Sequence, residues 1–217
     1  MRPQDRVRSP QHSRRAFLAK GAGCAFAAVA GQAFGQGLDI PLLPRELVGR
    51  LLVASPTMGD SRFERAVVYV ARHDQQGAFG IVVNKPQGTG PLEQVLRAFR
   101  LRAQPTNERV TVYWGGPVEP GRGFVLHSTD YGVEGALMVA GGLAVSRVET
   151  VAVAMAEGRG PASTLMAFGY TNWGNGQLDR EVAGGSWLVI GQDQKVIFDV
   201  PDDEKWKRAF AGFGVDL

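Results

Sequence analysis

The sequence predicts a single α+β domain with a mixed, largely antiparallel sheet flanked by helices. Short β-branched apolar runs recur between residues 51 and 190, and several are separated by glycine-containing turns of hairpin length. Four other segments have helical character, from apolar spacing or from an acidic first turn. Strand and helix segments mix irregularly along the chain, which favours the α+β class.

Each expected strand is an apolar run bounded by turn residues. Residues 51–54 form the first one. The β-branched run 66–71 lacks helical spacing, which predicts a buried strand, and the turn at 73–77 makes 78–84 its hairpin partner. Further strands are expected at 110–114, 124–127, 136–140, 164–168 and 187–190.

The expected helices follow apolar spacing and capping residues. After a chain break expected at 86–90, residues 91–99 carry apolar side chains on one helical face and a proline in the first turn. Ser146 is expected to cap a second helix, which turns the apolar positions 148, 151, 152 and 155 inward. Residues 177–183 form a third helix. Acidic residues after Pro201 favour a fourth, because a helix N-terminus attracts negative charge.

Charge divides the chain into two parts. Residues 1–35 contain six basic groups and one acidic group, whereas residues 36–217 contain 18 basic and 20 acidic groups and have a net charge of −2. The mildly acidic body and its lack of a helix-turn-helix pattern count against direct nucleic-acid binding. Cys24, the only cysteine of the chain, lies in the first part. The body therefore has no disulfide, thiolate zinc site or cysteine nucleophile.

Residues 1–35 have the features of a twin-arginine signal peptide. Arg14 and Arg15 lie in a charged leader, and a weakly apolar stretch of thirteen residues, 21–33, follows. That stretch is shorter than the roughly 20 residues with which a helix spans a bilayer. We therefore expect the twin-arginine export machinery as a partner, although a disordered or amphipathic N-terminal tail is an alternative.

Removal of the signal is expected to leave residues 36–217 as a periplasmic or secreted domain without a transmembrane segment. Small residues at the end of the apolar stretch, Gly31 with Ala33 or Ala33 with Gly35, offer two cleavage sites of the small-x-small kind. Two alternatives stay open. The segment before Cys24 faintly resembles a lipoprotein cleavage box, which would make this cysteine an acylated N-terminus. A start codon placed too far upstream would leave a cytoplasmic protein, but no methionine lies between Met1 and Met58.

Four blocks of distinctive residues follow one another through the body. The first is GRLLVASP at 49–56, followed by Asp60, Phe63 and Arg65. The second contains VVYV at 67–70, His73 and GAFGIVVNKP at 77–86. The third is GGPV at 115–118 with GFVLH at 123–127, and the fourth is GYTNWGNGQL at 169–178 with Glu181 and Trp187. In this order, from about residue 45 to the C-terminus, they resemble the AlgH/YqgE family of bacterial proteins.

The resemblance implies a compact α+β domain without an established reaction, linked by name to the regulation of alginate production. Family members are usually cytoplasmic and start near the first strand, so an export signal is a departure. Three functions stay open. The favoured one is a non-enzymatic binding or regulatory domain that contacts an unidentified protein or small ligand after export. The others are an enzyme with His and Asp acid–base groups and a cytoplasmic transcriptional regulator of the AlgH type.

The two histidines of the body are the first candidates for chemistry. His73 follows one expected strand and His127 ends another, and Asp60 or Asp74 would complete a mixed metal site with them. The alternative is that each ring makes a hydrogen bond at a strand end. No His-x-x-x-His pair occurs, and no metal or other cofactor is predicted.

The segment from Trp173 to Gln177 is the strongest candidate ligand site. Glycines ahead of a helix leave backbone N–H groups free for an anion, with Gln177 as an amide donor and Trp173 as an apolar wall. The alternative is structural: Gly176 shapes a strand-to-helix turn, Trp173 fills the core and Gln177 caps the helix. This structural alternative needs only the ability of glycine to form turns to explain the motif.

Arg65 and Asn84 complete the candidate ligand-binding residues. Asn84 either bonds a neighbouring loop or stands beside Lys85 at an anion site, and a structural turn is the simpler reading. Arg65 belongs to a basic stretch with Arg62 and Arg72. Because acidic residues interleave with these arginines, the stretch is expected to be a solvated ion-pair face.

Overall fold

The computed structural model describes residues 47–212. The strands are β1 (Leu51–Ala54), β2 (Val67–Asp74), β3 (Gly77–Val82), β4 (Pro86–Pro91), β5 (Arg109–Trp114), β6 (Val118–Ser128), β7 (Leu137–Val139), β8 (Leu143–Arg147), β9 (Thr164–Trp173) and β10 (Trp187–Ile190). The helices are α1 (Leu92–Ala98), α2 (Val148–Ala156), α3 (Gln177–Ala183), α4 (Gln194–Phe198) and α5 (Asp202–Ala211), with a 3-10 turn, η1, at Ser61–Phe63.

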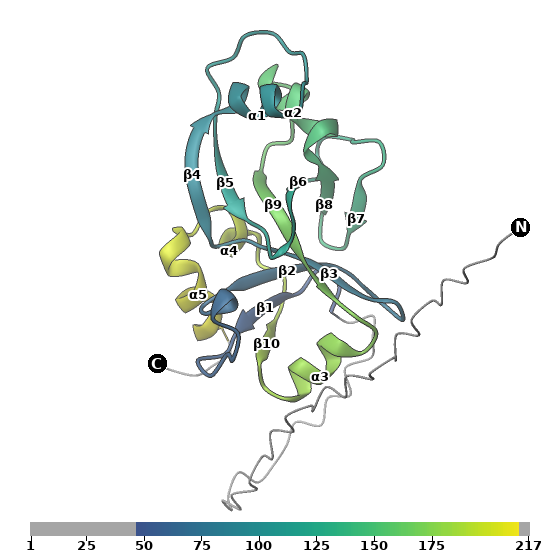
Figure 1. The fold of residues 1–217 in the computed structure, drawn as a ribbon, viewed down its shortest axis with the longest axis vertical. Coiled ribbons are helices and arrows are strands. Elements are labelled where there is room, and N and C mark those ends of the chain that lie inside the picture. Colours follow the sequence, from purple (N-terminus) through teal and green to yellow (C-terminus); the bar gives the residue numbers. More distant parts are fainter. Residues whose placement is uncertain (1–46, 213–217) are drawn as a thin grey trace, which may run out of the picture. The chain divides into compact units, whose positions relative to one another are not determined.

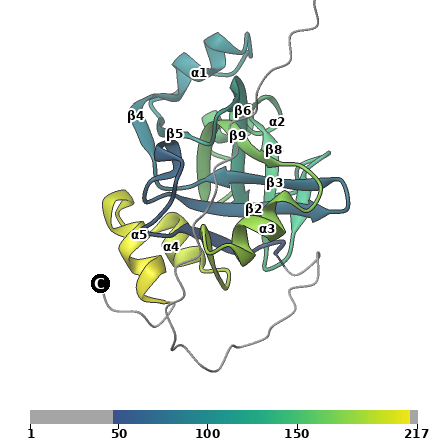
Figure 2. The same ribbon diagram turned by 60° about the horizontal axis from the view of Figure 1, so that its bottom comes forward.

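The strands form two layers that share β9 (Figure 1). The first layer has the order β10-β1-β2-β3-β9, with antiparallel pairing throughout. The second layer has the order β4-β5-β9-β6-β8-β7, in which β5 and β9 pair in parallel and the other pairs are antiparallel. Figure 2 shows β2 and β3 running across the direction of β6, β8 and β9, as in an orthogonal sheet packing.

β9 serves both layers because its backbone changes course midway. Its residues 164–168 pair in continuous register with β6, Tyr170 pairs with Val118 after a register shift, and residues 171–173 pair with β3. Gly169, between these halves, has a φ of +73°, and a Cβ there would lie 2.3 Å from the carbonyl oxygen of Gly116. A side chain would collide with that backbone, so glycine permits the strand to pass from one layer to the other.

Alternating apolar side chains build cores on both faces of each layer. In β1, Leu51 and Val53 face the inner core between the layers, whereas Leu52 and Ala54 face outward. α4 and α5 add to the inner core, α3 covers the outer face of the first layer, and α1 and α2 cover the outer face of the second. Burial on both faces explains why a strand such as β2 reads as a continuous apolar run.

The predicted α+β class with a largely antiparallel sheet is confirmed. The strands at 51–54 and 187–190 and the helix at 177–183 have the predicted bounds. β2 and β3 pair through a turn as expected. These segments are short and bounded by turn residues, so local sequence is sufficient to place them.

Two local predictions were wrong. The expected break at 86–90 is strand β4, which pairs with β5 at the edge of the second layer. Prolines and glycines are tolerated there because an edge strand leaves one side of its backbone unpaired. Ser146 does not cap α2: it lies in β8, and Arg147 occupies the N-cap position.

Two elements were not anticipated, namely β8 and α4. The predicted signal peptide, including Arg14, Arg15 and Cys24, lies outside the described residues. Among residues 47–212, no helix is long and apolar enough to cross a membrane.

Candidate functional site

Three of the predicted site residues line one cleft. Asp60 comes from the loop before η1, Trp173 from the end of β9 and Gln177 from the start of α3. Together with Glu181 and Trp187 they border a cavity of about 320 Å³, which we call the α3 cleft. The three segments meet here because α3 folds back against the outer face of the first layer.

Glu181 organises the α3 cleft. Its Oε2 accepts hydrogen bonds from the indole nitrogens of Trp173 and Trp187, each at 2.9 Å, and its Oε1 accepts one from Gln177 Nε2 at 2.8 Å. Both indoles are almost wholly buried, so these bonds satisfy donors that water does not reach. Glu181 therefore ties β9, α3 and β10 together.

The glycine turn before α3 is also held by internal hydrogen bonds. Gln177 Oε1 accepts from the backbone N–H of Gly174 at 3.0 Å, and Gly176 has the left-handed φ of +63°. This is the arrangement expected of a strand-to-helix turn. The buried hydroxyl of Thr171, which has no hydrogen-bond partner, is the group at this cleft that stays unsatisfied.

Asp60 pairs with its own loop. Its carboxylate accepts the backbone N–H of Arg62 and binds the guanidinium, with Oδ2 at 2.7 Å from Arg62 Nη2. The hydrogen bond from Arg62 lowers the pKa of Asp60. Lys85 Nζ donates to the Arg62 carbonyl at 2.7 Å, and burial lowers the pKa of Lys85. Asp60 thus works as the cap of η1.

Arg65 and Asn84 connect two loops. Asn84 Oδ1 accepts from the backbone N–H of Val67, and its Nδ2 donates to the carbonyl of Arg65, each at 2.8 Å. Arg65 has a left-handed φ of +52°, and its guanidinium lies 5.8 Å from the ring centre of Trp206. These contacts fit the structural alternative for Asn84.

The two histidines are buried at separate places. His73 lies beside Asp179 of α3, with 3.4 Å between His73 Nε2 and a carboxylate oxygen. His127 Nδ1 lies 2.8 Å from the carbonyl oxygen of Ser128, so this nitrogen donates, and Nε2 accepts from Ser146 Oγ at 2.9 Å. Neither histidine lines the α3 cleft, and residues 47–212 contain no group of three or more His, Cys, Asp and Glu residues placed to hold a metal ion.

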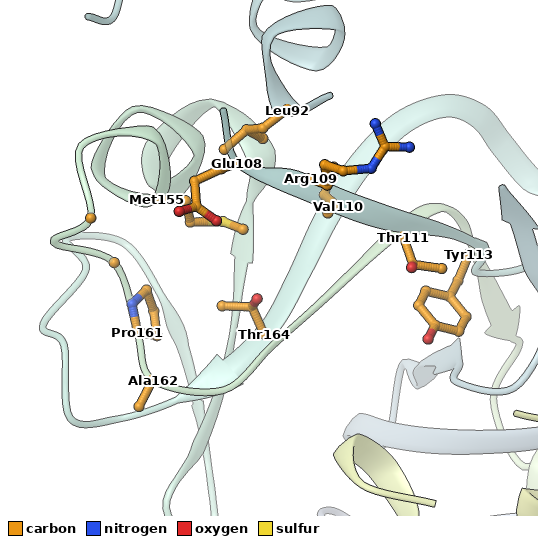
Figure 3. Close-up of a pocket in the computed structure, with 12 residues that line it drawn as sticks. Leu92, Glu108, Arg109, Val110, Thr111, Tyr113, Met155, Pro161, Ala162 and Thr164 are labelled. Atoms are coloured by element: carbon orange, nitrogen blue, oxygen red, sulfur yellow. The ribbon is translucent and has the colours of Figure 1, made fainter. Parts of the chain in front are cut away.

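A second cavity lies between β5 and the loop that leads from α2 into β9 (Figure 3). It has a volume of about 500 Å³. Figure 3 shows Glu108 and Thr164 directed toward its centre and the guanidinium of Arg109 directed away. The cavity opens where β5 and β9 diverge, since their parallel pairing covers only residues 112–114 and 166–168.

A third cavity, of about 330 Å³, is lined by three arginines. We call it the arginine cavity. Arg72 comes from β2, Arg122 from β6 and Arg147 from β8. Further lining residues are Phe79, Phe124, Gly135, Leu137, Val145, Ser146, Tyr170 and Asn172.

Strand register places the arginines on one face. Arg72 lies opposite Phe79, and Phe79 lies opposite Asn172, so these side chains point to the same side of the first layer. Arg147 lies opposite Phe124, which has the same strand parity as Arg122. The register therefore places all three arginines on strand faces that line the arginine cavity.

The arginine cavity has cationic groups in its lining, and their acidic partners lie outside that lining. Each arginine has one acidic neighbour: Asp74 at 3.5 Å from Arg72, Glu119 at 3.0 Å from Arg122 and Glu149 at 2.8 Å from Arg147. None of these acids is among the described residues that line the cavity. The arginine side chains remain 40–55% exposed, so solvent and small solutes reach them.

Sequence reasoning did not find this cavity. The Arg72–Asp74 pair agrees with the predicted ion-pair face, but the other two arginines are distant in sequence and carry no motif. The arginines meet because of how β2 pairs with β3 and β6 pairs with β8. A local sequence pattern does not reveal the register of these strand pairs.

Comparison with known proteins decides the family. A family model described as AlgH-like (DUF179) matches residues 51–217. The chain belongs to the AlgH-like family. A UPF0301 protein of Rhodospirillum rubrum is 41% identical over 170 residues, which cover 78% of this chain and 88% of the relative. Another, from Methylococcus capsulatus, is 41% identical over 179 residues, covering 82% of this chain and 98% of the relative.

Two solved structures share the fold. The solution structure of the AlgH protein from Pseudomonas aeruginosa is 38% identical, with a TM-score of 0.67, and covers 77% of this chain and 89% of that one. A crystal structure of protein DIP2367 from Corynebacterium diphtheriae is 20% identical, with a TM-score of 0.60, over 75% of this chain and 84% of that one. The second likeness concerns the fold alone.

Proposed function

We propose that this AlgH-like protein is a non-enzymatic binding domain that acts after twin-arginine export and holds a small anionic ligand in the arginine cavity. The observation that carries the proposal is the convergence of Arg72, Arg122 and Arg147 on one cavity without an acid in its lining. Guanidinium groups recognise carboxylate and phosphate groups through paired N–H donors.

Accessibility supports binding at this cavity. The arginines are partly exposed, and among residues 47–212 each forms an ion pair with one acidic side chain, so donors remain for a ligand. In the α3 cleft, by contrast, Glu181, Gln177 and Asp60 already bond to neighbouring groups of the protein. An incoming anion therefore meets more free donors in the arginine cavity than in the α3 cleft.

The export part of the proposal rests on the sequence of residues 1–35. The family model begins at residue 51. The match with the Methylococcus relative covers 98% of that relative but 82% of this chain. These values are consistent with a leader added to an AlgH-like domain. A binding protein in the periplasm fits a body with a net charge of −2, which has little attraction for nucleic acid.

A titration with inorganic phosphate tests the binding proposal. Backbone amide shifts of the isotopically labelled protein are followed by NMR while phosphate is added at low ionic strength. We expect shifts around β2, β6 and β8 and saturable binding that weakens as salt is raised, because salt screens exposed charges. Each of Arg72→Gln, Arg122→Gln and Arg147→Gln is expected to weaken binding at least threefold.

Arg97→Gln is the matched control. Arg97 is an exposed arginine of α1 that pairs with Glu93 at 3.6 Å and does not line the arginine cavity. Phosphate binding by this variant should equal that of the unchanged protein. Equal binding by all four variants, or no saturable binding at all, contradicts the proposal.

A further inference from the structure

We infer that the arginine cavity selects an anion that carries an aromatic ring. The inference rests on the proposed function and specifies its ligand class, an aromatic ring bearing a phosphate or carboxylate group. It follows from the composition of the cavity lining, in which three aromatic and two aliphatic side chains accompany the arginines, with Ser146 and Asn172 as the other polar side chains.

Three aromatic rings form the apolar wall of the arginine cavity. The ring centres of Phe79 and Phe124 are 5.4 Å apart, those of Phe79 and Tyr170 are 5.2 Å apart, and those of Phe124 and Tyr170 are 5.7 Å apart. Their interplanar angles of 48–78° are tilted or edge-on, so the rings meet face to edge. A further aromatic ring fits such a cluster because edge-to-face and offset contacts are the favoured ones.

Partial exposure leaves this wall available to a ligand. Phe79 and Tyr170 are half-buried, and Leu137 is 38% exposed at the rim. Arg122 lies over the Phe124 ring, with its guanidinium carbon 5.6 Å from the ring centre. A planar guanidinium in this position offers one face for stacking and its edge for an anion.

The size of the arginine cavity argues against a bare anion. Its 330 Å³ equals the liquid volume of about ten water molecules. An inorganic phosphate would fill a small part and leave the aromatic wall in contact with water. A ligand with a ring would remove that apolar surface from water, which is favourable.

Tyr170 keeps the wall uncharged. Its hydroxyl donates to Glu119 Oε1 at 3.2 Å, and burial, followed by the contact with Glu119, raises the pKa of Tyr170. The phenol therefore stays neutral where phosphate and carboxylate groups are ionised. The Glu119 carboxylate beside the phenol is itself paired with Arg122, at 3.0 Å from Nη1.

Three probes of graded chemistry test the inference: inorganic phosphate, cyclohexyl phosphate and phenyl phosphate. Dissociation constants are measured by calorimetry on the same protein. We expect phenyl phosphate to bind about tenfold more tightly than inorganic phosphate, since burial of an aromatic ring contributes at least 1.4 kcal/mol. Cyclohexyl phosphate should fall between them, because it buries apolar surface without aromatic contacts.

The Phe79→Leu variant tests whether the preference for phenyl phosphate comes from aromatic contact or from apolar surface alone. This variant keeps an apolar side chain at the wall, and a thermal melt establishes that it is folded. We expect it to retain inorganic phosphate binding and to lose the preference for phenyl over cyclohexyl phosphate. The Phe99→Leu variant, whose ring contacts Phe168 outside this cavity, should retain the preference.

The outcomes distinguish the two proposals. Arginine-dependent phosphate binding without any gain from the phenyl ring would leave the proposed function standing and overturn the ligand class. A phenyl preference that survives in Phe79→Leu would also overturn it. If neither phosphate nor phenyl phosphate binds, the arginine cavity is not an anion site and both proposals fail.

Discussion

Gly176 shows how one residue shapes the end of β9. Its φ of +63° lies in the left-handed region, and it sits at the N-cap position of α3. A Cβ at this position would lie 3.2 Å from Arg180 Nη1, the end of a flexible side chain. Backbone conformation, more than space, therefore favours glycine here.

Gly176→Ala is expected to destabilise the protein by about 1–2 kcal/mol, the cost of a left-handed conformation for a residue with a Cβ. Gly174→Ala is the matched control, because its φ is ordinary and its nearest neighbour, Gln177 Oε1, would be 3.9 Å from the new Cβ. Urea unfolding followed by tryptophan fluorescence measures both. Equal losses in the two variants would refute the conformational explanation.

Tyr113 couples stability to alkaline pH. Burial, then the charge and hydrogen bond of Asp202, raises the pKa of Tyr113 to about 12. The folded state holds this proton more tightly than the unfolded state, whose tyrosine pKa is about 10. The stabilisation is therefore complete below pH 10 and is lost as pH rises toward 12.

The Tyr113→Phe variant removes this dependence. At each pH, the unfolding free energy of the variant is compared with that of the unchanged protein. We expect the difference to be constant up to about pH 9. Between pH 10 and 12 the unchanged protein should lose stability that the variant keeps. Urea titrations at each pH give this difference. A constant offset up to pH 12 would show that Tyr113 ionises normally.

At the scale of elements, α5 is anchored by a buried lysine. Lys205 is 2% exposed, its Nζ donates to the Val83 carbonyl at 2.9 Å, and it pairs with Asp202 Oδ1 at 2.7 Å. Trp206, the next residue, donates to the Ala54 carbonyl at 2.8 Å. Both carbonyls belong to the first layer or its continuation, so α5 is fixed by polar as well as apolar contacts.

Lys205→Met is expected to destabilise the protein by about 3 kcal/mol, because the Asp202 carboxylate and the Val83 carbonyl lose their buried cation. Lys207→Met, on the exposed side of the same helix, should change stability by less than about 0.5 kcal/mol. Denaturant unfolding at neutral pH measures both variants. Similar stabilities of the two would mean that the buried ion pair contributes nothing.

Local patterns predicted the elements that local forces decide. The β2–β3 hairpin and α3 have clear turn residues and apolar runs, and they appear where predicted. β4 was missed because its prolines and glycines suit both a break and an edge strand. Ser146 resembles a helix cap in sequence, but its hydroxyl bonds His127 on the neighbouring strand, a contact that only the β6–β8 register creates.

The candidate site was predictable only in part, for the same reason. Asp60, Trp173 and Gln177 were singled out from sequence and do share a cleft. The arginine cavity joins residues from β2, β6 and β8, and their meeting depends on how two layers cross. A sequence pattern does not contain that crossing, so Arg122 and Arg147 carried no signal.

At the scale of the whole molecule, the chain combines a basic N-terminal segment, residues 1–35, with an acidic AlgH-like body. Arg14→Lys together with Arg15→Lys is expected to leave the full-length precursor in the cytoplasm, because the paired arginines are the proposed export signal. Fractionation and intact-protein mass measure location and cleavage. Arg6→Lys with Arg8→Lys is the control and should be exported; unchanged export of both variants would refute the signal.

The sharing of β9 has a consequence for the order in which the protein is made. Neither layer has its full set of neighbouring strands until residues 164–173 have left the ribosome, and β10, the outer partner of β1, follows later still. A nascent chain that stops before β9 holds hairpins with open edges, which are prone to association with other chains. Chaperone protection during synthesis should therefore matter most before this strand emerges.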